Sequence, residues 1–336
     1  MAFFEGRENN IHSSNPFEDF LIASDFDRIF EAMVDDLIAQ PKDFPSHIKW
    51  DEQEDGKRID HLFKYKSIID DSSLAYYIVD SKYYTTVKKN PLDNTGRGNK
   101  IEGDSLFKQF TYARNLIQER LRNPDKEAQN PRYSVCRDDK TEGYNIIPNF
   151  FLSAYIDQEH LQYDDNGIEH RDQDDRVTHF SNRLFDRETL LVSHYDINFL
   201  YVIKQYSNNG SKEQLREEIH QIFRNNVLKR LNNEYSFYIL ELKNKPKQGE
   251  EQQALKEALD PIFRLVNGKV FCPKKEPSYT NLILALEKPE NHISASSKQL
   301  EEENREVIAA FEKDFVTPKE FKLGANIKEI IKKTAE

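Results

Sequence analysis

The stretch from residue 59 to residue 84 constrains the fold more than any other part of the chain, because its pattern predicts a β-hairpin. Residues 59–65 (IDHLFKY) alternate apolar and polar side chains, as a half-buried strand does. Residues 69–73 (IDDSS) carry turn-forming aspartates and serines, and residues 74–84 (LAYYIVDSKYY) are rich in β-branched and aromatic side chains. A hairpin centred near position 70 places residue 60 opposite residue 80.

Three ionisable side chains meet at the open end of this predicted hairpin. Directly opposed residues have Cβ atoms roughly 5 Å apart, and residues two apart on one strand share a face. Asp60, Asp80 and Lys82 would therefore converge. Two facing carboxylates repel each other unless a cation lies between them, and Mg²⁺ prefers oxygen ligands. A neighbouring lysine can hold an attacking water and stabilise charge growing on a phosphate, so the three residues indicate phosphodiester hydrolysis.

Two amphipathic helices are expected, one before and one after the hairpin. Residues 26–38 repeat apolar side chains at helical spacing, and Glu31 lies at the border of the apolar face. Residues 105–117 form a second such segment, with Asp104 placed to cap it and Gln109 in its first turns. Both helices could pack against the predicted sheet.

The arrangement resembles the PD-(D/E)xK nuclease superfamily, in which an acidic residue on one strand precedes D-x-K or E-x-K on the next. Asp60 would be the first acid, and residues 80–82 (DSK) would be the second element. Ile59 stands where the proline that gives the superfamily its name would be. A D-x-K tripeptide arises often by chance in a chain that is 32% charged, so its context in the hairpin carries the resemblance.

The resemblance implies a role for each candidate residue. Asp60 and Asp80 would bind Mg²⁺, with Mn²⁺ able to substitute, and Lys82 would position water and help to activate it. Glu31 would be an auxiliary metal ligand or water holder on the first helix. Gln109 would contact the site or a phosphate from the second helix. The alternative for the last two is that Glu31 is an ordinary rim glutamate and that Gln109 is solvated.

A narrower likeness covers most of residues 20–290. Residues 26–33 (FDRIFEAM), the D-x-K hairpin and residues 193–200 (SHYDINFL) are together similar to the LlaJI-type restriction endonucleases, relatives of the nuclease subunit of McrBC-type systems. The likeness implies an α/β fold with a restriction-endonuclease-like core, that is, a mixed central sheet flanked by helices. It also implies a cytoplasmic enzyme of bacterial anti-phage defence that cuts double-stranded DNA with Mg²⁺ and works with a separate AAA+ GTPase or ATPase.

The distribution of charge allows a nucleic-acid partner near the hairpin. The chain carries a formal charge of -11, which argues against indiscriminate DNA binding. From residue 57 to residue 122, however, 13 Lys and Arg face 8 Asp and Glu, a local balance of +5 that leaves -16 for the rest. The candidate phosphate contacts, each of which could equally be solvated, are Lys57, Arg58, Lys64, Lys66, Lys88, Lys89, Arg97 and Lys100.

The rest of the chain predicts further strands and helices, and 336 residues can form one large α/β domain or two smaller ones. We expect an N-terminal tail over 1–15 and a nuclease domain over 16–290, with polar insertions near 122–143 and 157–188. A C-terminal α/β extension would end in a charged helical segment over 291–336. No apolar stretch is long enough to span a bilayer and no signal peptide is evident, so a cytoplasmic protein is expected.

Two other patterns are weaker candidates for a site. Residues 241–243 (ELK) also read E-x-K at a strand end, but no hairpin acid precedes them at a matching distance. Ser193 and His194 near Asp196 contain the residue types of acyl transfer without a nucleophile elbow. We expect Asp196 to cap a following helix, while His194 could orient a group near the site.

Two alternatives to a motor-coupled restriction nuclease stay open. The chain could be a stand-alone DNA repair or junction nuclease, or a non-catalytic DNA-binding or assembly subunit that keeps the fold. It could also act as a homo-oligomer. The recognition sequence, any methylation dependence and the cut positions depend on loops whose geometry the sequence does not give.

Overall fold

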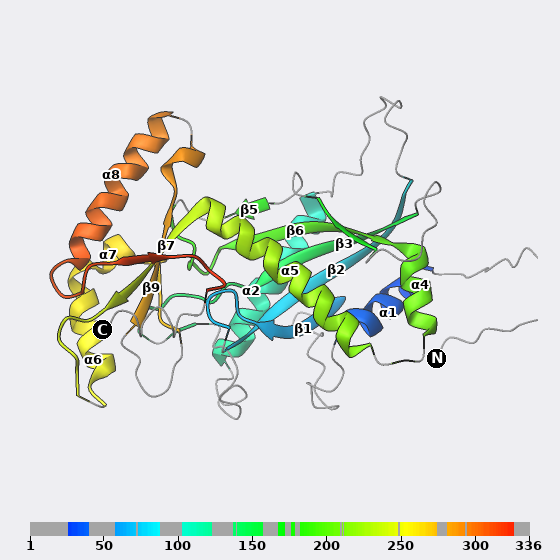
Figure 1. Ribbon diagram of the computed structural model, residues 1–336, viewed down its shortest axis with the longest axis horizontal. Coiled ribbons are helices and arrows are strands. Elements are labelled where there is room, and N and C mark those ends of the chain that lie inside the picture. Colours follow the sequence, from blue (N-terminus) through cyan, green and yellow to red (C-terminus); the bar gives the residue numbers. More distant parts are fainter. Residues whose placement is uncertain are drawn as a thin grey trace, which may run out of the picture.

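The computed structural model describes much of the chain, and the structural statements below refer to those residues. Figure 1 shows two sheets, with the long helix α5 (Glu213–Glu234) running along the first toward the second. None of the helices in the described parts is both long and apolar enough to cross a membrane. The described ranges are 26–39, 58–71, 73–87, 103–122, 137–138, 140–156, 167–171, 176–178, 182–208, 210, 212–247, 249–273, 281–292 and 294–325.

Six strands within the described ranges form the first sheet, which is mixed, as predicted. β1 is antiparallel to β2, whereas β2, β3 and β6 run parallel, and β4 and β5 are antiparallel to β6. Parallel neighbours need a crossover connection, and α2 (Gly103–Arg122) lies between β2 and β3 in the chain. The order is β1 (His61–Lys66), β2 (Leu74–Val87), β3 (Pro148–Ile156), β6 (Leu190–Asn198) and β4 (Ile168–His170), with β5 (Arg176–Thr178) also on β6.

Strands β1 and β2 form the predicted hairpin in the predicted register. His61 pairs with Val79, and every further pair in the ladder also has residue numbers that sum to 140. The same register places residue 60 opposite residue 80. Because side chains alternate along a strand, this pairing puts Phe63 and Tyr77 together on one face, where their rings stack with centroids 5.2 Å apart.

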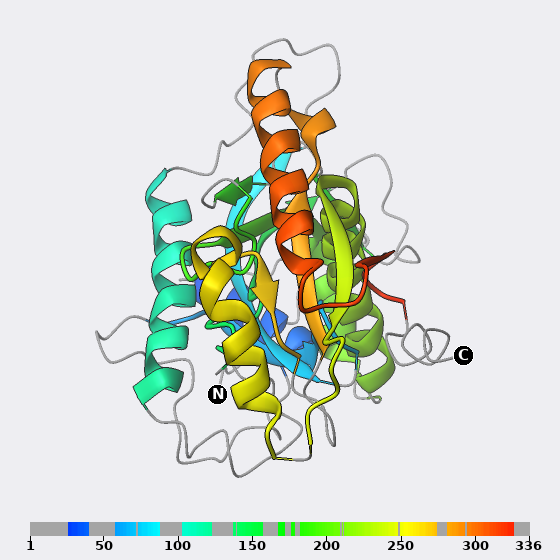
Figure 2. The same ribbon diagram turned by 90° about the vertical axis from the view of Figure 1, so that its left-hand side faces the viewer.

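Helices cover both faces of the first sheet. α1 (Phe26–Ile38), α4 (Phe199–Ser207) and α5 pack on the face that carries Tyr77 and Val79, and they share one hydrophobic core. α2 packs on the opposite face, against Tyr76 and Ile78. Figure 2 shows α2 and α5 on opposite sides of the molecule. An α/β sheet with helices on both faces is therefore confirmed.

The second sheet is antiparallel and follows α5 directly. One of its faces, with Phe237 and Ile283, joins the core beneath α5, and the other, with Leu240 and Leu284, packs against α6 and α8 (Figure 2). Its strand order is β10 (Lys319–Phe321), β7 (Tyr235–Glu241), β9 (Asn281–Glu287) and β8 (Val270–Phe271). The helical segments of this region are α6 (Glu251–Leu259), η2 (Asp260–Ile262), α7 (Phe263–Val266), η3 (Pro289–Asn291) and α8 (Ser294–Phe311).

Strand pairing joins segments across the bounds of the expected domains, whose division of the chain stays a prediction. Strands β7, β8 and β9 belong to the second sheet although they fall within 16–290, and β10 of the segment 291–336 pairs with β7. The stretch 157–188, expected to be a polar insertion, contributes β4 and β5 to the first sheet. These pairings join segments far apart in sequence, which local patterns do not signal. The tail over 1–15 lies outside the described residues.

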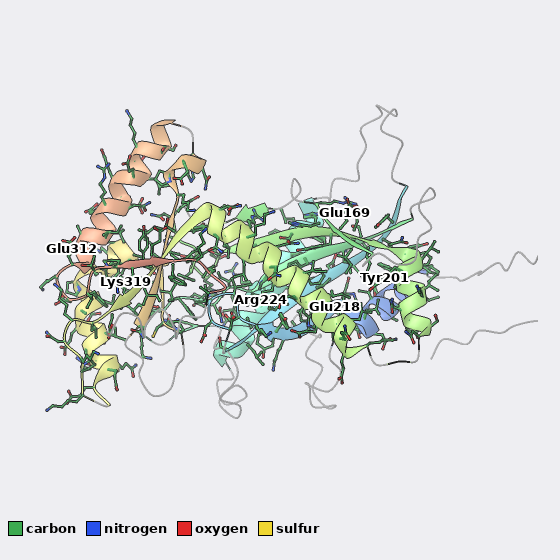
Figure 3. All side chains as sticks on the ribbon, in the orientation of Figure 1. Glu169, Tyr201, Glu218, Arg224, Glu312 and Lys319 are labelled. Atoms are coloured by element: carbon green, nitrogen blue, oxygen red, sulfur yellow. The ribbon has the colours of Figure 1, made fainter. Side chains whose placement is uncertain are left out.

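A buried arginine of α5 holds the turn of the hairpin in place. Arg224, labelled in Figure 3, is 4% exposed and donates from Nε and Nη2 to the Ser67 carbonyl oxygen at 3.2 and 3.0 Å. Its guanidinium also forms an ion pair with Asp71. The turn is thereby fixed against the helix that covers the sheet, and this fixes the start of β2.

Replacement of this arginine should cost much of the stability of the hairpin. Arg224→Met keeps the length of the side chain but leaves the Ser67 carbonyl oxygen buried without these donors, so the free energy of unfolding should fall by about 2–4 kcal/mol. Urea denaturation would measure it. Lys66→Met is the control, because the exposed Lys66–Glu217 pair (3.4 Å) should contribute no more than about 1 kcal/mol. Equal losses in the two variants would contradict the anchoring role.

Candidate active site

The D-x-K element lies on the α2 face of β2. Asp80 is 4% exposed, and its carboxylate forms an ion pair with the Lys82 ammonium, two residues along the same face. The Lys82 Nζ also lies 5.9 Å from the centre of the Phe151 ring on the neighbouring strand β3. Since the Lys82 side chain keeps 20% of its surface exposed, its ammonium is confined but still reachable.

Asp60 reaches the same end of the hairpin through the backbone of β2. β1 begins at His61, whereas β2 continues beyond Asp80, so the ladder between the two strands ends here. The Ser81 N–H donates to the Asp60 Oδ2 at 3.1 Å. A side-chain carboxylate thus accepts a backbone hydrogen bond at the point where the strand pairing stops, and this contact places Asp60 beside Asp80.

The electrostatics show that the two aspartates share one environment. The pKa of Asp60 is raised from 3.8 to about 7, mainly by burial and next by the negative charge of Asp80. His61 and Lys82 act in the opposite direction, and Glu31 on α1 adds a smaller increase. Glu31 is therefore close enough for its charge to act on Asp60, and its role as a metal ligand or water holder stays a prediction.

Gln109 of α2 is fully buried, so the alternative that it is solvated is not what the structure shows. Neither its Oε1 nor its Nε2 has a hydrogen-bond partner among the described residues. The residues that flank it, Leu106 and Phe110, pack against Phe151, so this turn of α2 lies over the face that carries Asp80. A buried amide without partners is unusual in a folded protein and is typical of a group that meets a ligand or water.

The carboxylates do not form a ready-made metal cluster. No three His, Cys, Asp or Glu side chains in the described parts of the chain lie close enough together to hold an ion. Asp60 and Asp80, with Glu31 nearby, are the oxygen donors that the structure brings toward one another. Hard cations such as Mg²⁺ are bound by one or two carboxylates and several waters, so two aspartates are a sufficient protein contribution.

The candidate DNA contacts differ in how exposed their side chains are and in whether they lie among the described residues. Arg58 is exposed just before Asp60, whereas Lys64 is 6% exposed with its Nζ 5.1 Å from the centre of the Tyr76 ring. Because so little of Lys64 is exposed, it offers little of its side chain to a phosphate backbone. Lys66 pairs with Glu217 instead. Five other candidates lie outside the described residues: Lys57, Lys88, Lys89, Arg97 and Lys100.

The weaker patterns have structural partners. Glu241 belongs to the second sheet, and the Lys243 Nζ donates to the Glu312 carbonyl oxygen at 2.5 Å. Asp196 does not cap a helix, because β6 continues to Asn198, whose side chain accepts the Leu200 N–H. The Asp196 carboxylate instead accepts hydrogen bonds from the Arg171 guanidinium, with which it forms an ion pair. Neither pattern forms a second candidate site.

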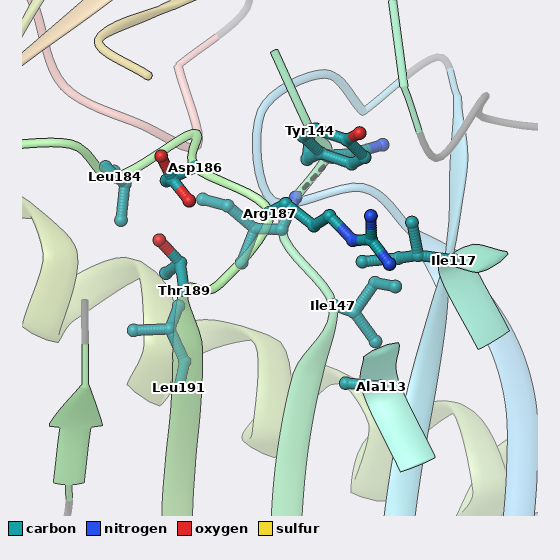
Figure 4. A pocket seen from close by; sticks show the side chains of 11 residues that line it. Ala113, Ile117, Tyr144, Ile147, Leu184, Asp186, Arg187, Thr189 and Leu191 are labelled. Carbon is teal, nitrogen blue, oxygen red and sulfur yellow. Dashed lines mark hydrogen bonds between the residues drawn. The ribbon is translucent and has the colours of Figure 1, made fainter. Parts of the chain in front are cut away.

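A pocket opens elsewhere on the α2 face, between α2 and the segment before β6 (Figure 4). Arg187 extends through it past Ile117 and Ile147, and its Nη2 donates to the Gln118 Oε1 at 3.0 Å. Most of the other side chains that line it are apolar, and Asp60, Asp80, Lys82 and Gln109 are not among them. The pocket is therefore separate from the D-x-K element.

The structure adds one network that the sequence analysis missed. His61 Nδ1 lies 3.1 Å from the Asp35 Oδ1 of α1, and His61 Nε2 lies 3.0 Å from the Ser81 Oγ. His61 is 1% exposed beneath α1, on the face opposite Asp60. The alternating pattern marked position 61 as polar, but only the packing of α1 over it reveals its partners.

Comparison of the chain with known proteins gives no relative of this site. No protein-family model, no curated protein and no solved structure matches the chain.

Proposed function

We propose that the protein is a Mg²⁺-dependent nuclease that hydrolyses phosphodiester bonds of DNA on a restriction-endonuclease-like core. One observation carries the proposal. The hairpin register brings the half-buried Asp60 and the buried Asp80 together, the pKa of Asp60 rises to about 7, and the Lys82 ammonium forms an ion pair with the Asp80 carboxylate. Burying a second acid beside the first is costly, and such costs are typical of sites that bind a cation or transfer protons.

The donor set fits a hard divalent cation. A bound ion would offset the two largest causes of the raised pKa of Asp60, the cost of burying its charge and its repulsion from Asp80. Asp60 and Asp80 would bind Mg²⁺ directly, and Glu31 would hold a coordinated water or complete the set. Mn²⁺, which also accepts oxygen ligands, would substitute. Mg²⁺ supplies a bound water of lowered pKa and polarises the phosphate.

The remaining residues of the site would act on the water and the substrate. Lys82 would hold the attacking water and stabilise the charge that grows on the phosphate oxygens. Gln109, buried and without partners among the described residues, would donate to a phosphate oxygen or to a water of the site. Arg58, exposed next to Asp60, would contact the DNA backbone, where a cation gives affinity without sequence preference.

The wider assignment, a bacterial anti-phage restriction system with a separate AAA+ motor, is the part of the proposal that rests on the resemblance. The local balance of +5 around the hairpin supports only the double-stranded DNA substrate of that system. Cleavage that requires GTP or ATP and a second protein would favour it. Cleavage without either would favour a stand-alone repair or junction nuclease.

Metal binding and DNA cleavage test the proposal together. The purified chain should bind Mg²⁺ or Mn²⁺ in a calorimetric titration, and affinity should rise with pH up to about 7, because Asp60 must lose its proton first. DNA should be cut with Mg²⁺ and left intact with EDTA. A chain that binds DNA but takes up no ion would be the non-catalytic subunit, and the nuclease assignment would be lost.

A further inference from the structure

Asp60, His61 and Ser81 are linked in a closed ring by one peptide bond and two hydrogen-bond contacts. Asp60 and His61 are neighbours in the chain, the His61 Nε2 lies 3.0 Å from the Ser81 Oγ, and the Ser81 N–H donates to the Asp60 Oδ2 at 3.1 Å. Ser81 is thus held on two sides, by its hydroxyl and by its backbone. Asp60 itself precedes the first residue of β1, so the register brings it opposite Asp80 and the contact with the Ser81 N–H holds its carboxylate.

Asp35 connects this ring to the helix that covers the sheet. An ionised carboxylate only accepts hydrogen bonds, so in the neutral imidazole Nδ1 carries the proton and donates to the Asp35 Oδ1 at 3.1 Å. Nε2 then accepts from the Ser81 hydroxyl. The Asp35 side chain is 52% exposed, whereas that of His61 has no exposed surface. The imidazole therefore links a surface carboxylate of α1 to the strand that carries the D-x-K element.

These three residues do not form a nucleophilic triad, although Asp, His and Ser follow one another at hydrogen-bond distance. Ser81 is 5% exposed, and its hydroxyl faces the imidazole under α1. A nucleophile must reach an electrophilic carbon or phosphorus atom in a substrate. The network is therefore suited to holding other groups in place.

We propose that His61 is a positioning residue of the metal site, which holds Ser81 so that the Ser81 N–H fixes the Asp60 carboxylate in its ligating position. This role rests on the proposed function. Groups that orient metal ligands through hydrogen bonds typically change metal affinity 10- to 100-fold when they are replaced. The effect of His61 should accordingly appear in metal affinity, beyond any loss of stability.

Two substitutions of the same residue separate the contact to Ser81 from the contact to Asp35. In His61→Asn the amide nitrogen takes the place of Nδ1 and reaches Asp35 but not Ser81. In His61→Gln the amide takes the place of Nε2 and reaches Ser81. Ser81→Ala removes the hydroxyl and keeps the backbone N–H, so it should resemble His61→Asn.

The experiment measures Mn²⁺ affinity by calorimetry and the unfolding temperature in EDTA for the full chain and its variants. His61→Asn and Ser81→Ala should weaken Mn²⁺ binding by about 10-fold or more, while His61→Gln stays close to the unsubstituted chain. His220→Gln is the matched control. His220 is equally buried, bonded to the Ile38 carbonyl oxygen and stacked on Phe63, so this variant should lower the unfolding temperature and leave Mn²⁺ affinity unchanged.

The outcomes separate the two proposals. If the unsubstituted chain binds no Mn²⁺, the nuclease assignment falls and the positioning role falls with it. If that chain binds Mn²⁺ but His61→Asn binds it equally well, only the positioning role is overturned. Equal weakening in His61→Asn, His61→Gln and His220→Gln would also overturn it, because general destabilisation would then explain the losses. Should His61→Asn fail to fold, Ser81→Ala against His61→Gln gives the same comparison.

Discussion

Lys82→Ala should abolish DNA cleavage while the protein stays folded. The ammonium of Lys82 lies on the Asp80 carboxylate at the proposed metal site, where a positive charge stabilises the developing phosphate charge and holds the attacking water. Loss of one preorganised donor of this kind typically lowers kcat by about 10²- to 10³-fold. Asp80→Asn should cost at least as much, because it removes a charged ligand. A supercoiled plasmid assay at saturating Mg²⁺ would measure both.

Residues 241–243 (ELK) supply a control, because they place a lysine two residues after an acid as residues 80–82 (DSK) do. Lys243→Ala removes a lysine at the same spacing from an acid on a strand, but its partner is the Glu312 carbonyl oxygen in the second sheet. Cleavage by this variant should equal that of the unsubstituted chain.

DNA binding by Lys82→Ala should persist, because one cation among many contributes a small part of the phosphate contacts. Unchanged cutting by Lys82→Ala, or equal losses in both lysine variants, would refute the site.

The part of the site that sequence could predict is the part set by local pattern. Alternation and turn chemistry over residues 59–84 fix a hairpin whose two arms are adjacent in the chain, so its register follows from the position of the turn. That register is what brings Asp60 and Asp80 together. The helical spacing of residues 26–38 likewise matches α1, and the resulting helix carries Glu31.

Residues whose role depends on distant packing could not be predicted in the same way. His61 reads as a polar position of a half-buried strand, but α1 covers that face and gives it Asp35 as a partner. Lys64 reads as a solvated strand residue, but it is buried beside Tyr76 on the face of the sheet where α2 packs. Both outcomes depend on which helix covers which face, and no local pattern encodes that choice.

The second sheet shows the same limit at a larger scale. β7 pairs with β9 and with β10, and about 80 residues separate β7 from β10 in the chain. Each strand is short enough to look like an isolated apolar run. The pairing of these strands therefore lies outside the reach of sequence patterns.

Asp60→Asn should stabilise the metal-free protein at neutral and alkaline pH. The pKa of Asp60 is about 7 in the folded protein, against 3.8 for the ordinary side chain. Between these values the folded state binds more protons than the unfolded state, so the stability of the unsubstituted protein falls as pH rises from about 4 to about 7. Asparagine does not ionise, and its side-chain oxygen can still accept the Ser81 N–H.

The size of this effect follows from the same shift. Each pKa unit corresponds to about 1.4 kcal/mol, so Asp60→Asn should gain on the order of a few kcal/mol above pH 7 and little below pH 4. Urea denaturation in EDTA from pH 4 to pH 8 would measure the difference. Asp138→Asn is the contrasting control, because the buried Asp138 carboxylate accepts backbone N–H bonds from Lys140, Thr141 and Cys272, and an amide nitrogen facing such donors should destabilise the protein throughout.

Mg²⁺ should remove much of the stability advantage of Asp60→Asn if Asp60 is a metal ligand. An ion that binds only the folded state stabilises it by about 2.7 kcal/mol at 100 times its dissociation constant. The unsubstituted protein should gain this stabilisation, whereas Asp60→Asn, which lacks a ligand charge, should gain much less. A raised pKa that served only packing would predict the same advantage of Asp60→Asn with and without Mg²⁺. A smaller difference between the two stabilities on addition of Mg²⁺ therefore separates a binding site from a buried acid that has no ligand.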